Sequence, residues 1–130
     1  MAELSAAGGR VRPTGGLELY AWFFMRVSGI LLLLLALGHL VIMHLIHNVD
    51  EVNFAFVAGR WANPLWRLYD WLLLMLALVH GCNGLRVVVD DYVHSAGWRM
   101  VTQVSVYVVT VLFLIAGSLA ILTFNPELGG

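Results

Sequence analysis

His80 interrupts a long apolar stretch that runs from Leu72 to Tyr92. An ionisable side chain in the middle of a bilayer is costly, so its presence there indicates a functional site. Imidazole is also the side chain that most naturally ligates a haem iron from a helix. The residues alone leave two interpretations open, an axial haem ligand and a neutral histidine that bonds a neighbouring helix.

Asp91 and Tyr92 follow near the end of the same stretch, just after Asp90. At about 1.5 Å per helical residue, Tyr92 lies roughly 18 Å along the axis from His80, where a helix leaves the hydrocarbon. A quinone carbonyl that gains two electrons also needs two protons, and a phenol beside a carboxylate supplies a donor and a proton path. Tyr92 and Asp91 are therefore a candidate quinone-binding pair. The alternative is an interfacial tyrosine beside a solvated acidic helix end.

Arg26, Arg86 and Arg99 fall at one predicted membrane edge, where they are suited to neutralise haem propionates or an acidic partner surface. Snorkelling arginines that follow the positive-inside rule explain all three without such a role. Arg26 is the strongest candidate, because the sequence Arg-Val-Ser-Gly places it at the entrance of a helix with small residues behind it.

The first apolar stretch contains three histidines. His39 is predicted slightly past the midplane, so a second haem ligand and a two-haem arrangement stay open. His44 and His47 are one helical turn apart and are predicted to be interfacial. Further along, Asp70 follows Arg67 by three residues, which predicts a surface ion pair on one helix face.

Composition indicates a one-domain integral membrane protein. The 130 residues are 61% hydrophobic, with a mean hydropathy of +0.87, well above a soluble domain. All seven basic residues are arginines and eight acids balance them, so no basic patch argues for nucleic acid. No motif for nucleotide binding, zinc or hydrolysis is present. The single cysteine, Cys82, excludes covalent haem attachment through Cys-x-x-Cys-His, so a bound haem would be b-type.

Three apolar stretches predict an all-α membrane protein with three transmembrane helices, at about residues 22–47, 65–89 and 98–124. Residues 1–16 are predicted to be a flexible cytoplasmic tail, and residues 17–130 the three-span domain. A loop with a short interfacial amphipathic helix is expected at 48–63. Pro64 then suits the first turn of the second span, and Pro126 is expected to stop the third.

The arginines also predict orientation, because cytoplasmic loops carry the excess of positive charge. With three spans, the N-terminus and the second loop share a side that holds five of the seven arginines, namely Arg10, Arg12, Arg26, Arg86 and Arg99. The opposite side holds Arg60 and Arg67. The N-terminus and the turn after Tyr92 are therefore predicted to be cytoplasmic, and the C-terminus to lie outside.

Several patterns together resemble a known family. They are His80-x11-Tyr92 with its acidic pair, Trp98-Arg99-x3-Gln103 at the opening of the last span, and Arg-Val-Ser-Gly at 26–29. In these features the chain resembles the smaller hydrophobic membrane anchor subunit of succinate dehydrogenase, complex II. The likeness covers about residues 20–124, including span number and loop lengths.

The resemblance implies roles for individual residues. His80 would be an axial ligand of haem b, with the second ligand coming from the larger cytochrome b anchor subunit. Arg26 would lie near the haem propionates. Tyr92 would hydrogen-bond the quinone, either menaquinone or ubiquinone, with Asp91 beside it for proton delivery. The three spans would bundle with those of the partner anchor subunit.

The resemblance also implies a place in respiratory electron transport. Succinate would be oxidised at a flavoprotein subunit, electrons would pass through an iron–sulfur subunit, and quinone would be reduced at the cytoplasmic face of a bacterial cytoplasmic (inner) membrane. This chain would be part of an enzyme only as a subunit. One alternative is a haem-free anchor of a fumarate reductase-type complex, which has no reason to bury His80. Another is a small oligomeric transporter, which predicts membrane-embedded acids, whereas Asp70, Asp90 and Asp91 lie near span ends.

Overall fold

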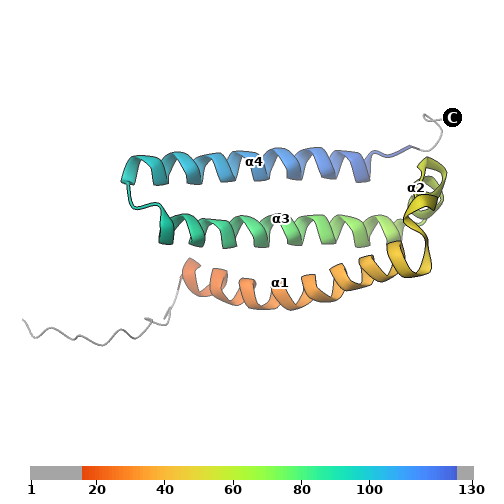
Figure 1. Cartoon of the computed structure of the whole chain (residues 1–130), viewed down its shortest axis with the longest axis horizontal. Helices are drawn as coiled ribbons and strands as arrows, with labels where there is room; N and C mark the ends of the chain where they lie inside the picture. Colours follow the sequence, from red (N-terminus) through yellow and green to blue (C-terminus); the bar gives the residue numbers. More distant parts are fainter. Residues whose placement is uncertain (1–15, 126–130) are drawn as a thin grey trace, which may run out of the picture.

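The computed structural model describes residues 16–125, and within that range the regular structure is all helical. Three long helices, α1 (Leu17–Leu40), α3 (Pro64–Tyr92) and α4 (Ala96–Leu122), run antiparallel in one layer with α3 in the middle (Figure 1). The short helix α2 (Phe54–Trp61) closes the end where α1 leads to α3. The predicted all-α fold is confirmed. The predictions for the tail before Gly16 and for Pro126 concern residues outside the described range.

Three segments are long and apolar enough to cross a membrane. They are Leu19–Ile46, Pro64–Tyr92 and Ala96–Leu122, with mean hydropathies of 2.5, 1.9 and 2.4. At about 1.5 Å per residue, each exceeds a hydrocarbon core of about 30 Å. The three predicted spans are therefore present, although α3 continues three residues beyond the predicted end at 89 and α4 begins two residues before 98. Hydropathy underestimates the length of both helices because the turns next to the α3–α4 connection contain polar residues.

Local sequence explains where the second span begins. The Asn63 side chain accepts a hydrogen bond from the Leu65 N–H at 2.9 Å, which caps α3, and Pro64 occupies its first turn as predicted. Asn53 caps α2 in the same way through the Phe56 N–H. Before them, α1 ends in a π-helical turn, Val41–Ile46, and the His47 ring packs edge-on against Phe56. The helical segment ends at His47, and the 3-10 turn Val49–Glu51 leads from it to α2.

The long helices approach closely where glycines face bulky side chains. A Cβ added at Gly117 of α4 would lie 2.6 Å from Leu74 Cδ2 of α3, and one at Gly38 of α1 would lie 2.9 Å from the Tyr69 hydroxyl. Next to Gly117, Trp71 Nε1 donates to Ser118 Oγ at 3.1 Å. Small residues at such crossings let the backbones approach, and interhelical hydrogen bonds add to the packing. Both crossings tie α3 to its neighbours.

Asp70 organises the end of the molecule that carries α2. Its carboxylate accepts from Arg60 NH2 at 3.0 Å, Arg60 Nε at 3.3 Å and Trp61 Nε1 at 2.8 Å, and it lies 3.6 Å from His39 Nδ1. The Arg60 side chain is 7% exposed and stacks over Trp66. We refer to His39, Arg60, Trp61 and Asp70 as the Asp70 cluster. It fastens α2 to α3.

The predicted pair between Arg67 and Asp70 is wrong. Arg67 instead donates to the Trp61 carbonyl at 2.6 Å and to the Phe124 carbonyl at 3.1 Å. The spacing rule behind the prediction considers contacts only between residues of the same helix. Here α2 brings Arg60 onto Asp70, and Arg67 bonds the carbonyls at the ends of α2 and α4.

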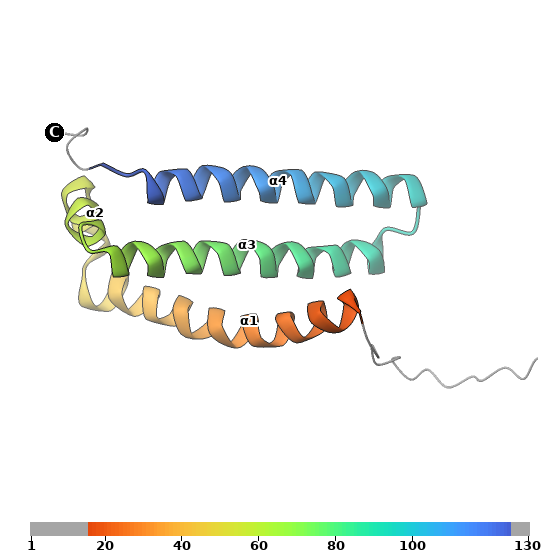
Figure 2. The ribbon, with the colours of Figure 1, turned by 180° about the vertical axis from the view of Figure 1, so that it is seen from behind.

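Most apolar side chains of this layer are exposed. Among residues 16–125, only Val89, Ile121 and Ser28 are buried. Lipid tails are as apolar as leucine, so a membrane subunit gains little from withdrawing such side chains. Figure 2, which shows the layer from behind, has the same three helices side by side. Both broad faces are therefore suited to contact lipid or other subunits.

We predict that Asp70→Asn destabilises the attachment of α2. The substitution leaves the Arg60 guanidinium buried without an anionic partner, and breaking a buried ion pair costs about 3–5 kcal/mol. The full-length protein in detergent should melt at a lower temperature and be cleaved faster by trypsin at Arg60. Asp50→Asn, at an exposed position of the 3-10 turn Val49–Glu51, is the matched control. Equal melting and cleavage of the two variants would contradict a structural role for the cluster.

Candidate functional site

His80 lies half-buried near the middle of α3 and faces α1. Its Nδ1 is 2.8 Å from the hydroxyl of Ser28, which is 1% exposed and the most deeply buried polar side chain described. Gly29 follows, and a Cβ added there would lie 3.4 Å from His80 Cε1. The small residues of the Arg-Val-Ser-Gly sequence therefore admit the imidazole between the two helices.

One pattern of hydrogen bonds around Ser28 would set the tautomer of the ring. Ser28 Oγ also lies 3.5 Å from the Met25 carbonyl, which can only accept a hydrogen bond. If the hydroxyl donates to that carbonyl, it accepts from His80 Nδ1–H, and Nε2 then carries the free lone pair. Within residues 16–125 no second group hydrogen-bonds the imidazole. A histidine whose Nδ1–H is held by an oxygen and whose Nε2 is free is arranged as a metal ligand.

Tyr92 is the last residue of α3 and is 78% exposed. Asp91 beside it is also exposed. The carboxylate of Asp90 accepts from Gln103 Nε2 at 2.6 Å, which ties α3 to α4 next to the short turn between them. In the described part of the chain neither Asp91 nor Tyr92 has a hydrogen-bond partner for its side chain. Of the acidic pair, Asp90 is therefore hydrogen-bonded, and Asp91 is the carboxylate that is available to bind another group.

The structure does not bring Arg26 to His80. The Arg26 guanidinium carbon lies 4.4 Å from the centre of the Trp22 ring. Two residues along an α-helix correspond to a rotation of about 200°, so Arg26 and Ser28 point to opposite sides of α1. Arg86 differs, because its Nε is buried without an acceptor in the described chain. A buried N–H group without an acceptor destabilises the protein, so Arg86 is the arginine most suited to bind an additional oxygen acceptor.

His39 is not part of the His80 site. It belongs to the Asp70 cluster, and α1 meets Tyr69 of α3 at the neighbouring residue, Gly38. Tyr69 and His80 are separated by eleven residues, or about 16 Å along α3. The two histidines are too far apart to ligate the same iron, so His39 could serve only a second haem.

Sequence reasoning missed Ser28 and Gln103 as partners of site residues. Both residues stood inside the patterns that carried the resemblance, Arg-Val-Ser-Gly and Trp-Arg-x3-Gln. A serine directly behind the helix entrance and a glutamine in the first turns of the last span were the available signals. Neither pattern predicts which residue of the neighbouring helix is contacted.

A family model described as the succinate dehydrogenase/fumarate reductase transmembrane subunit matches residues 3–120. The chain belongs to this family. It is also similar to a succinate dehydrogenase hydrophobic membrane anchor subunit of Archaeoglobus fulgidus, with 34% identity over 100 residues that cover 77% of this chain and 82% of the relative. The resemblance inferred from the residues is confirmed.

Membership of the succinate dehydrogenase/fumarate reductase transmembrane subunits makes this chain a multi-pass membrane component of an oxidoreductase complex. The family match favours the anchor interpretation over the oligomeric transporter. It also agrees with the exposed apolar faces of α1 and α4, which suit a subunit embedded in lipid beside other chains.

Proposed function

We propose that this chain is the membrane anchor of a succinate:quinone oxidoreductase, contributes His80 as one axial ligand of a haem b, and forms part of the quinone-reduction site. The observation that carries the proposal is the bond between His80 Nδ1 and the buried Ser28 hydroxyl. The bond also ties α1 to α3, and the feature that favours a ligand is the ring orientation, in which no described group hydrogen-bonds Nε2. The bond leaves Nε2 as the ligand atom.

The residues around His80 fit a haem. Gly29 faces the His80 ring and Gly84 faces Met25, so these glycines let α1 and α3 approach each other beside the proposed ligand. The unpaired Nε of Arg86 would donate to a propionate, whereas Arg26 lies over Trp22 on the opposite side of α1 from Ser28. The larger cytochrome b anchor subunit would supply the second axial ligand. When bound, the haem supplies a one-electron carrier within the membrane.

Tyr92 and Asp91 would act on the quinone. The Tyr92 hydroxyl would donate a hydrogen bond to a quinone carbonyl and so orient the ring, and Asp91 would pass protons toward it from the water phase. Reduction of quinone to quinol takes two electrons and two protons. The electrons would come from succinate through the flavoprotein and iron–sulfur subunits. Because Gln103 holds Asp90, Asp91 is the carboxylate free for proton delivery.

The arrangement of arginines supports a cytoplasmic docking end. Arg26, Arg86 and Arg99 lie toward the end of the bundle that holds the start of α1 and the α3–α4 turn (Figure 1). Arg60 and Arg67 at the other end bond Asp70 and backbone carbonyls. The positive-inside rule then places the N-terminus in the cytoplasm and the C-terminus outside. The flavoprotein and iron–sulfur subunits would dock at the cytoplasmic end, in a bacterial inner membrane.

We predict that Ser28→Ala weakens haem retention by about 10–100-fold and raises the midpoint potential of the haem. Without the hydroxyl, His80 Nδ1–H loses its acceptor, the imidazole becomes a poorer electron donor, and the oxidised iron is less stabilised. Haem-to-protein ratio and redox titration of the purified complex measure both effects. Ser118→Ala removes another interhelical hydroxyl, the partner of Trp71, and should leave both values unchanged. Identical haem properties in the two variants would remove Ser28 from the haem site.

We predict that Tyr92→Phe lowers quinone reductase activity by about 100-fold, the low end of what a positioned proton donor contributes. Succinate oxidation with a soluble dye as electron acceptor should persist, because that reaction bypasses the membrane site. Tyr107→Phe, at an exposed position of α4, is the control. Unchanged quinone reduction in Tyr92→Phe would contradict the proposed role of the phenol.

A further inference from the structure

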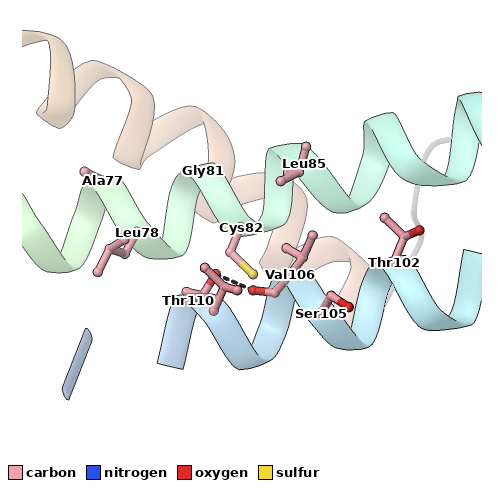
Figure 3. A pocket seen from close by; sticks show the side chains of 10 residues that line it. Ala77, Leu78, Gly81, Cys82, Leu85, Thr102, Ser105, Val106 and Thr110 are labelled. Atoms are coloured by element: carbon pink, nitrogen blue, oxygen red, sulfur yellow. Dashed lines mark hydrogen bonds between the residues drawn. The ribbon is translucent and has the colours of Figure 1, made fainter. Parts of the chain in front are cut away.

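A groove lies between α3 and α4 on a side of α3 turned away from His80. Its volume is about 470 Å³, within the range of pockets that hold small molecules. Figure 3 shows Cys82 and Leu85 of α3 and Val106 of α4 among the side chains that border it. A Cβ added at Gly81 would meet no atom within 4 Å, so this glycine leaves open space in the groove wall.

The groove offers apolar contacts and little hydrogen bonding. Thr102, Ser105 and Thr110 line it, but each hydroxyl donates to the carbonyl four residues earlier in α4, at 2.8 Å in every case. A hydroxyl has one proton, so hydroxyls bonded in this way can donate no hydrogen bond to another molecule. A molecule bound here would therefore be held by its apolar surface.

The groove leads toward Tyr92. Leu85, Gly81 and Leu78 precede Tyr92 by 7, 11 and 14 residues. At 3.6 residues per turn, all three lie within about 40° of Tyr92 around α3, whereas His80 is about 120° away. Along the axis they lie roughly 10 to 21 Å from Tyr92. The same face of α3 thus carries the phenol at the membrane edge and the groove below it.

We propose that this groove binds the isoprenoid tail of the quinone whose head group is held at Tyr92. The inference rests on the proposed quinone site. A quinone has a polar ring and a long apolar chain, and the face of α3 presents a phenol followed by an apolar channel in the same order. The pocket-sized volume and the bonded hydroxyls suit a flexible chain of this kind.

Gly81→Leu, which fills the groove, tests the proposal in the purified complex. We expect the apparent KM for a long-tailed quinone to rise about tenfold, the effect of losing burial of about two methylene groups. The KM for a tail-less quinone analogue and kcat for both should stay unchanged. Ala116→Leu adds the same bulk at an exposed position of α4 outside the groove and should change neither KM.

Three results would overturn the proposal. One is an equal rise in KM for both quinones, and another is no change for either. A third is loss of the other subunits on purification of Gly81→Leu, which would show that a partner helix occupies the groove. These outcomes are distinct from failure of the head-group site, because Tyr92→Phe should impair long-tailed and tail-less quinones alike.

Discussion

The hydrogen bond between Ser28 and His80 joins two membrane-spanning helices at a depth where little water competes for either group. It aligns α1 with α3, and the Met25 carbonyl lies 3.5 Å from the same hydroxyl. At the far end, His39 Nδ1 of α1 lies 3.6 Å from Asp70 of α3, and Asp70 bonds Arg60 and so holds α2 against α3. Between these two contacts, the Tyr69 hydroxyl of α3 also donates a hydrogen bond to the Leu35 carbonyl of α1, and apolar packing holds the rest of the register.

The central helix α3 serves different contacts on different faces. One face presents His80 to α1, and the face that packs Leu74 against Gly117 of α4 also carries the groove and Tyr92. His80 and Tyr92 differ by about 120° around the axis and roughly 18 Å along it. A haem at His80 and a quinone at Tyr92 would therefore occupy separate sides of one rigid helix. That separation suits electron transfer between two groups that do not compete for space.

The roles of His80, Asp91 and Tyr92 stay predictions, whereas local rules predicted the spans, the Pro64 start and the short helix before it. They succeeded because hydropathy, helix length and capping depend on neighbours in sequence. They failed wherever the partner lies on another helix.

The Arg67–Asp70 pair was wrong because Arg60 arrives from α2, and neither the bond from Gln103 to Asp90 nor the unpaired Nε of Arg86 follows from spacing. Membrane helices are strongly apolar all round, so periodicity gives little indication of which face meets which neighbour.

The most direct test of the account is a reduced-minus-oxidised optical spectrum of the complex purified with this chain, comparing wild type, His80→Ala and His39→Ala. The account predicts a b-type haem band in the wild type that is lost or shifted in His80→Ala, with the other subunits still present, and retained in His39→Ala. An unchanged band in His80→Ala would contradict the assignment of the ligand. A wild-type complex with no haem would instead identify the chain as a haem-free anchor.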